Sequence, residues 1–206
     1  MNGAGKIFHK TGLSLIYKNS LNLIDLKKGD SLLDIGCGNG KILHELESAQ
    51  GGLKLFGIDP EPEKIGAAKS YNANSPNKFS DENLNGQTNS QISFKIAYAS
   101  DLPYTNSSMD WIISTLSFHH MPNEEKGKAI GEIARVLKQG GKLLITDFGR
   151  PAGFFGTIFA WLSRSHAYTK DNMTLVEQFL LQNNFRILKT TRTWGWIENV
   201  LAERKT

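Results

Sequence analysis

The sequence predicts a single doubly wound α/β domain over residues 1–206, with a mostly parallel sheet, helices on both faces and an antiparallel last strand. Three observations lead to this prediction. Apolar strand-like runs alternate with helix-like segments from Ser31 to Thr146, which is the pattern of βαβ units. The first strand runs directly into the glycine-rich turn Gly36–Gly40. Two strand-like runs then follow one another at the end of the chain, and a hairpin there would reverse the strand direction.

The elements in the first half of the chain follow from apolar spacing and from breaker residues. Helical spacing marks an N-terminal helical segment over 1–28, and acidic residues suit the first turn of the helix at 61–69. Residues 72–91 are rich in Asn, Ser, Gln and Asp, so they predict a long, mobile polar loop. The predicted elements are a helix at 11–26, a strand at 31–35, a helix from 41 to the break at 51–52, a strand at 53–58 and a helix at 61–69.

The second half of the chain repeats the alternation and then changes. The continuous apolar run Met109–Leu116 is typical of a strand buried on both faces. Gly140 and Gly141 are predicted to end a helix before the next strand, and Thr174 with Glu177 fits a capping box that opens the last helix. The predicted elements are strands at 93–97, 109–116, 142–146, 185–193 and 198–203, and helices at 123–138 and from 174 to about 183.

Composition excludes several classes of protein. The formal net charge of +4 is spread along 206 residues, without the run of like charges that marks a nucleic-acid-binding tail. Cys37 is the only cysteine, so no internal disulfide can form. The N-terminus lacks the apolar core of a secretory signal, and no run approaches the ~20 apolar residues of a membrane span. We therefore expect a cytoplasmic protein that does not bind nucleic acid.

The glycine turn indicates a nucleotide-like ligand. Its three glycines, Gly36, Gly38 and Gly40, allow a ligand to approach bare backbone, and the following helix points its N–H groups and positive dipole end at that ligand. A dinucleotide fingerprint needs G-x-G-x-x-G, but Lys41 stands where its third glycine would be. A P-loop is also absent, so a pyrophosphate-binding turn is disfavoured. The alternative is a turn that only lets a helix pack closely against a strand.

Two acidic residues follow neighbouring strands at the edge where α/β sheets bind ligands. Asp59 ends the second strand and could accept both hydroxyls of a ribose. Asp101 follows the third strand and could accept a hydrogen bond from an adenine amino group, with Leu102 packed on the ring. The alternatives are a turn-forming Asp before Pro60 and a solvated loop acid.

Five blocks, DIGCGNG, GIDPEPEKI, ASDLPY, MDWIISTLSFHHM and VLKQGGKLLITDF, resemble the class I S-adenosylmethionine-dependent methyltransferases over about residues 30–150. The resemblance is to the small-molecule branch that includes ubiquinone and menaquinone biosynthesis methyltransferases. It implies a Rossmann-like seven-stranded sheet and S-adenosyl-L-methionine as cofactor. It also implies that the glycine turn holds the methionine part of the cofactor, and that acids after the second and third strands hold the ribose and the adenine. The residues assigned to the cofactor on this basis are Asp34, Gly36, Cys37, Gly38, Gly40, Asp59, Pro60, Ser100, Asp101, Leu102, and Thr115 and Leu116 through their carbonyls.

The chemistry implied by this resemblance is a one-step in-line displacement at the methyl group, which needs alignment and exclusion of water. No covalent intermediate is required, so Cys37 is interpreted as a small turn residue. His119, after the fourth strand, is a candidate base, and His120 is a weaker one. Packing or capping by these histidines is the alternative. No metal site is predicted.

The methyl acceptor is predicted to be a small, apolar molecule. The chain lacks the Asn/Asp-Pro-Pro-Tyr block and the Pro-Cys nucleophile of enzymes that methylate bases or glutamine. The apolar segment within 150–170 is interpreted as a lid over the acceptor, or as a contact with a membrane surface. A core-packed helix or a dimer contact is the alternative there, and Trp194 and Trp196 could join the pocket or simply pack. A nicotinamide-dependent oxidoreductase and a non-catalytic cofactor-binding scaffold are the alternative functions.

Overall fold

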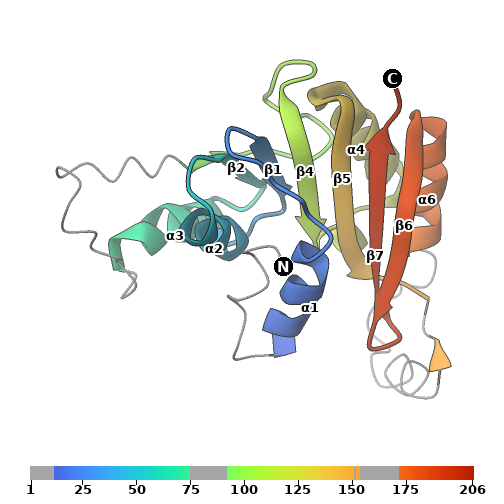
Figure 1. The fold of residues 1–206 in the computed structure, drawn as a ribbon, viewed down its shortest axis with the longest axis horizontal. Helices are drawn as coiled ribbons and strands as arrows, with labels where there is room; N and C mark the ends of the chain where they lie inside the picture. The colour runs from blue at the N-terminus through green and yellow to red at the C-terminus, as the bar shows by residue number, and fades with distance from the viewer. Residues whose placement is uncertain (1–11, 75–91, 151, 154–171) are drawn as a thin grey trace.

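The computed structural model describes residues 12–74, 92–150, 152–153 and 172–206, and a seven-stranded sheet forms its centre (Figure 1). The strand order is β3-β2-β1-β4-β5-β7-β6. The first five strands of this order are parallel, and β7 is antiparallel to both of its neighbours. The predicted doubly wound sheet with an antiparallel last strand is therefore confirmed.

The strands lie close to their predicted positions, except that β5 begins at Leu137 rather than at 142. They are β1 Ser31–Ile35, β2 Lys54–Asp59, β3 Ser93–Ile96, β4 Met109–Thr115, β5 Leu137–Phe148, β6 Phe185–Thr193 and β7 Ile197–Arg204. The helices are α1 Gly12–Leu21, α2 Lys41–Ala49, α3 Pro62–Asn74, the 3-10 helix η2 Phe118–His120, α4 Asn123–Val136 and α6 Asn172–Gln182.

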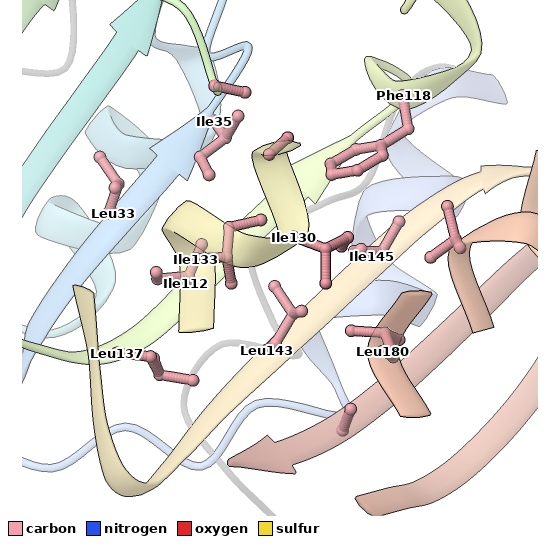
Figure 2. Close-up of a cluster of buried hydrophobic side chains, with 14 of the residues drawn as sticks. Leu33, Ile35, Ile112, Phe118, Ile130, Ile133, Leu137, Leu143, Ile145 and Leu180 are labelled. Atoms are coloured by element: carbon pink, nitrogen blue, oxygen red, sulfur yellow. The ribbon is translucent and has the colours of Figure 1, made fainter. Parts of the chain in front are cut away.

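Helices cover both faces of the sheet, and each face has its own core. Strand side chains alternate between the faces, so Leu32 and Leu33 of β1 lie in different clusters. One cluster joins the sheet to α4 and α6 through Ile130, Ile133 and Leu180 (Figure 2). The other joins it to α1, α2 and α3.

Three predicted boundaries are wrong. Helix α4 ends at Val136 rather than at 138, because the N–H groups of Ser107 and Ser108 bind its last carbonyls at 2.9 and 2.8 Å and lead the chain straight into the sheet. Gly140 and Gly141 therefore lie inside β5, where its pairing register with β4 shifts, and do not form a turn between α4 and β5. Strand β4 ends at Thr115, and Leu116 lies outside it with a φ of 53°.

Two helices also begin or end differently from the prediction. Helix α6 begins at Asn172, whose amide donates to the Phe148 carbonyl at 3.2 Å, so Thr174 lies inside the helix and does not open it. Helix α3 continues to Asn74, three residues into the predicted loop. The rest of that loop, residues 75–91, lies outside the described residues, as does most of the apolar segment 150–170.

The topology creates a binding edge at the carboxyl ends of β1 and β4. The chain moves from β1 outward to β2 and β3, and then returns to place β4 on the other side of β1. Ligands of open α/β sheets bind where the strand order reverses in this way. The glycine turn follows β1 at this edge.

Candidate cofactor and methyl-transfer site

The glycine turn is a tightly bonded loop between β1 and α2. The N–H groups of Gly36 and Cys37 both donate to the carbonyl of Ile58 at 2.9 Å, which ties the turn to β2. The Gly40 N–H donates to the Cys37 carbonyl at 2.9 Å. Gly36, Gly38 and Gly40 have φ angles of 72°, 54° and 72°, the left-handed region that favours glycine.

The three glycines face different surroundings. A Cβ on Gly36 would lie 2.1 Å from Ser117 Oγ, and one on Gly40 would lie 2.6 Å from Phe94 Cζ. A Cβ on Gly38 would meet no atom within 4 Å. The absence of a side chain at Gly36 and Gly40 therefore lets Ser117 and Phe94 pack against the turn. Gly38 instead faces open space, where a ligand can approach the backbone.

Asp59 holds the turn from the end of β2. It is 8% exposed, and its Oδ2 accepts the Gly38 N–H at 3.0 Å while Oδ1 accepts the Glu61 N–H at 3.0 Å. Pro60, which lies between Asp59 and Glu61 in the sequence, is exposed. Each carboxylate oxygen has a second lone pair, so Asp59 retains the capacity to accept two hydroxyl groups.

Asp34 is a buried acid with an unsatisfied oxygen. Its side chain is 1% exposed, and Oδ1 has no hydrogen-bond partner. Burial, and secondly the negative charge of Asp59, raise the pKa of Asp34 well above its ordinary value. A buried polar atom without a partner is costly, and a cationic ligand group at this edge would remove that cost.

Cys37 is a buried thiol that feels the charges of both acids. Its side chain is 8% exposed. Burial, followed by the charges of Asp34 and Asp59, raises the pKa of the thiol. Since the thiolate is the nucleophilic form, this environment agrees with a small turn residue.

The segment after β3 is held by an ion pair that sequence analysis missed. Arg135 donates to the carbonyls of Leu102 and Tyr104 at 2.9 and 2.8 Å, and to the Glu132 carboxylate. Glu132 Oε2 accepts the Leu102 N–H at 2.8 Å. Asp101 itself is exposed and is one of the charges that raise the pKa of Arg135, after Glu132.

Leu102 lies in the core rather than at an exposed surface. Its side chain is 3% exposed and packs in the core cluster with α4, so it leaves almost no surface for an adenine ring. Ser100 is half-buried, and its hydroxyl, after Lys128, lowers the pKa of Glu125 of α4. The spacing of Glu132 and Arg135 in the sequence is that of an i, i+3 ion pair on a helix. Nothing in that spacing indicates that the pair also binds the segment after β3.

The segment after β4 brings a histidine to a buried acid. Thr115 is half-buried, and the Leu116 N–H donates to the Thr146 carbonyl at 2.8 Å. His119 is 6% exposed, and its Nδ1 lies 2.8 Å from Asp147 Oδ1. Sequence analysis missed Asp147, because the two residues are 28 positions apart and come from different elements.

Other expectations concern features outside this cluster. Within residues 12–74, 92–150, 152–153 and 172–206, no group of three or more His, Cys, Asp or Glu could hold a metal ion. No helix in that part of the chain is long and apolar enough to cross a membrane. The rings of Trp194 and Trp196 lie 5.9 Å apart in the β6–β7 turn, and Trp194 is 43% exposed.

Comparisons with known proteins agree with this geometry. A family model described as a methyltransferase domain matches residues 26–199. A 27-O-demethylrifamycin SV methyltransferase from Amycolatopsis mediterranei is 32% identical over 126 residues, which is 61% of this chain and 41% of that protein. Phosphoethanolamine N-methyltransferase 2 from Caenorhabditis elegans is 25% identical over 193 residues, 92% of this chain and 41% of that protein.

A solved structure shares the fold. A SAM-dependent methyltransferase from Methanosarcina mazei superposes with a TM-score of 0.68 at 24% identity, covering 87% of this chain and 94% of that one. The chain spans about half the length of the curated relatives it matches. The family match places the chain in the methyltransferase-domain family, and its fold is the one seen in a solved SAM-dependent methyltransferase.

Proposed function

We propose that this chain binds S-adenosylmethionine at the carboxyl ends of β1, β2 and β3 and transfers its methyl group to a small, apolar molecule. The observation that carries the proposal is the pairing of an open Gly38 backbone with the unsatisfied buried oxygen of Asp34, which lies in β1 two residues before the turn. A cation is the ligand group that such an oxygen favours, and the methionine end of this cofactor carries an ammonium and a sulfonium.

Each part of the cofactor has a proposed partner. The glycine turn, with Cys37 and Asp34, takes the methionine end, and the carbonyls of Thr115 and Leu116 reach the same group. Asp59, beside Pro60, takes the ribose hydroxyls, since both of its oxygens keep a lone pair. Ser100, Asp101 and the backbone of Leu102 take the adenine, on a segment that Arg135 already holds in place.

The chemistry needs alignment more than reactive side chains. The cofactor supplies a methyl group on a positively charged sulfur. The turn and Asp59 fix the position of that group, which removes translational and rotational freedom from the reaction. Burial of Asp34 and Cys37 keeps water from this side of the turn.

The acceptor is proposed to be small and apolar. The printed names of two relatives support a small molecule, because one acts on a demethylated rifamycin and the other on phosphoethanolamine. The apolar composition of residues 151–162 supports an apolar acceptor. Trp194, exposed in the β6–β7 turn, adds an aromatic surface at the carboxyl end of β5.

The test uses S-adenosylmethionine labelled in its methyl group and the small-molecule fraction of a cell lysate. We expect label to pass into compounds that partition into an organic solvent. Asp59→Ala should abolish most transfer and weaken S-adenosylhomocysteine binding by about 1–3 kcal/mol. Asp110→Ala is the matched control, because Asp110 accepts the Ser31 N–H at 2.9 Å at the opposite edge of the sheet. Equal loss in both variants, or no transfer by the wild type, would overturn the proposal.

A further inference from the structure

Asn172, the first residue of α6, has a buried carboxamide oxygen that no group of the protein satisfies. The residue is 1% exposed, and its Nδ2 donates to the Phe148 carbonyl at 3.2 Å. Because a carbonyl can only accept, this contact fixes which end of the carboxamide is the nitrogen. The oxygen, Oδ1, accepts no hydrogen bond from the part of the chain that the structure describes. A buried acceptor in this state has lost its hydration without a replacement.

Asn199 of β7 shows how the same side chain is buried where it serves the fold. It is also 1% exposed. Its Oδ1 accepts the hydroxyls of Thr146 and Ser20 at 2.8 and 3.0 Å, and its Nδ2 donates to the Thr191 hydroxyl at 3.3 Å. The unpaired oxygen of Asn172 is therefore not a general feature of this core, and it marks a place for a donor that the chain does not itself supply.

Asn172 lies at the edge of the sheet where the acceptor is expected. The proposed cofactor site takes the ends of β1, β2 and β3, which leaves the ends of β4 and β5 for the acceptor. The Phe148 carbonyl that holds Asn172 is at the end of β5, and the Phe148 ring packs edge-on against the His119 ring at 4.7 Å. Met173 and Val176 of α6 are buried in the core cluster shared with α4, so the helix holds Asn172 in a fixed place.

The strand order sets how far this oxygen lies from the reacting methyl group. Strand β4 lies between β1 and β5, and neighbouring strands are about 4.8 Å apart. Asn172, held at the end of β5, is therefore roughly 10 Å from the glycine turn that follows β1. The atom that takes the methyl group must touch the methyl carbon. A group bound by Asn172 is thus a different part of the acceptor.

We propose that Asn172 is a specificity-determining residue, and that its Oδ1 accepts a hydrogen bond from a hydroxyl or N–H group of the acceptor. This proposal rests on the function proposed above. The acceptor is then an extended, apolar molecule with a donor group about two strand spacings from the atom that is methylated. A compound without the donor leaves Oδ1 buried and unpaired, so the site rejects it. An ionised carboxylate does not fit, because it can only accept.

The first test compares the two buried asparagines and needs no acceptor. Leucine removes both polar ends of the carboxamide at a similar volume. Asn199→Leu should clearly lower the midpoint of urea denaturation, because three hydroxyl groups lose their partner. Asn172→Leu should keep a midpoint close to that of the wild type, because the loss of one hydrogen bond is offset by removal of an unpaired buried oxygen. A loss as large as that of Asn199→Leu would show that Asn172 serves the fold, and would overturn the proposal.

The second test uses the methyl-labelled cofactor and the lysate fraction described above. With a limiting amount of the fraction, Asn172→Leu should transfer label about 10- to 100-fold more slowly than the wild type. S-adenosylhomocysteine affinity should stay unchanged, because Asn172 does not touch the cofactor. Asn183→Leu is the matched control at the other end of α6, since Asn183 Nδ2 also donates to a carbonyl, that of Phe179 at 2.9 Å, and it should transfer label at the wild-type rate.

The products of the wild type give a further readout. The group bound by Asn172 is not methylated, so mass spectrometry in deuterated water should show an exchangeable hydrogen in the main labelled product. A main product without an exchangeable hydrogen, or equal rates in the wild type and Asn172→Leu, would overturn this proposal and leave the proposed function intact. Absence of label transfer or of S-adenosylhomocysteine binding in the wild type would instead contradict the proposed function.

Discussion

Gly36 and Gly38 are equivalent in the sequence, yet alanine at each should do different damage. Gly38→Ala adds a methyl group that meets no protein atom within 4 Å, so its folding cost is the left-handed backbone strain alone, about 1–2 kcal/mol. The same methyl group occupies the space proposed for the methionine end of the cofactor. We expect S-adenosylhomocysteine affinity to fall more than about tenfold, which is roughly 1.4 kcal/mol.

Gly36→Ala should act on folding instead. It carries the same strain at a φ of 72°, and its methyl group would lie 2.1 Å from Ser117 Oγ and 2.6 Å from Ser117 Cβ. Overpacking of this kind costs about 1–3 kcal/mol, so the total loss is roughly 2–5 kcal/mol. Ser117→Gly removes both atoms that would clash and should restore the overpacking part. Ser117→Ala should restore less, because it keeps the Cβ.

Urea denaturation followed by circular dichroism measures the folding term, and calorimetric titration with S-adenosylhomocysteine measures the binding term. The reasoning is refuted if Gly38→Ala binds the ligand as tightly as the wild type. It is also refuted if Gly36→Ala and Gly38→Ala have equal stability and Ser117→Gly rescues neither.

Three further predictions concern the surroundings of the turn. Burial, and secondly the charge of Asp59, raises the pKa of Asp34 above its ordinary 3.8. The contribution of Asp34 to the free energy of unfolding is therefore present below about pH 4 and is lost as pH rises through the raised pKa. Urea titrations of ligand-free Asp34→Asn should show a free energy of unfolding that depends less on pH between pH 4 and 8, and an unchanged pH dependence would contradict this. Arg135→Ala should cost about 1–3 kcal/mol of stability and weaken S-adenosylhomocysteine binding. Arg135→Lys should recover only part of both, because lysine lacks the forked donors of arginine. Equal affinity in the wild type and both variants would argue against a role for Arg135 in holding the segment after β3. Cys37, whose pKa is raised by burial, should resist iodoacetamide at pH 8 until the protein is unfolded, as mass spectrometry would show, and rapid native labelling would disprove its burial.

The sequence was sufficient for features that depend on local patterns. Alternating apolar runs predicted the sheet, and the two consecutive strand-like runs at the end predicted the antiparallel β7. The glycine turn and Asp59 were predictable because a strand, a turn and the next strand are close in the chain. Their contact, the Gly38 N–H with Asp59 Oδ2 at 3.0 Å, follows directly from that order.

Features that depend on contacts between distant segments were not predictable. The carboxylate of Asp147 meets His119 only because β5 lies beside β4. The boundary between α4 and β5 was misplaced because serine N–H groups from the loop before β4 bind the end of the helix. The distinction between Gly36 and Gly38 also required the position of Ser117, which no spacing in the turn indicates.

Calorimetric titration of the wild-type chain with S-adenosylhomocysteine and, separately, with NADH tests the central claim most directly. The account predicts saturable one-to-one binding of S-adenosylhomocysteine and no saturable heat with NADH. Saturable binding of NADH with no response to S-adenosylhomocysteine would contradict it.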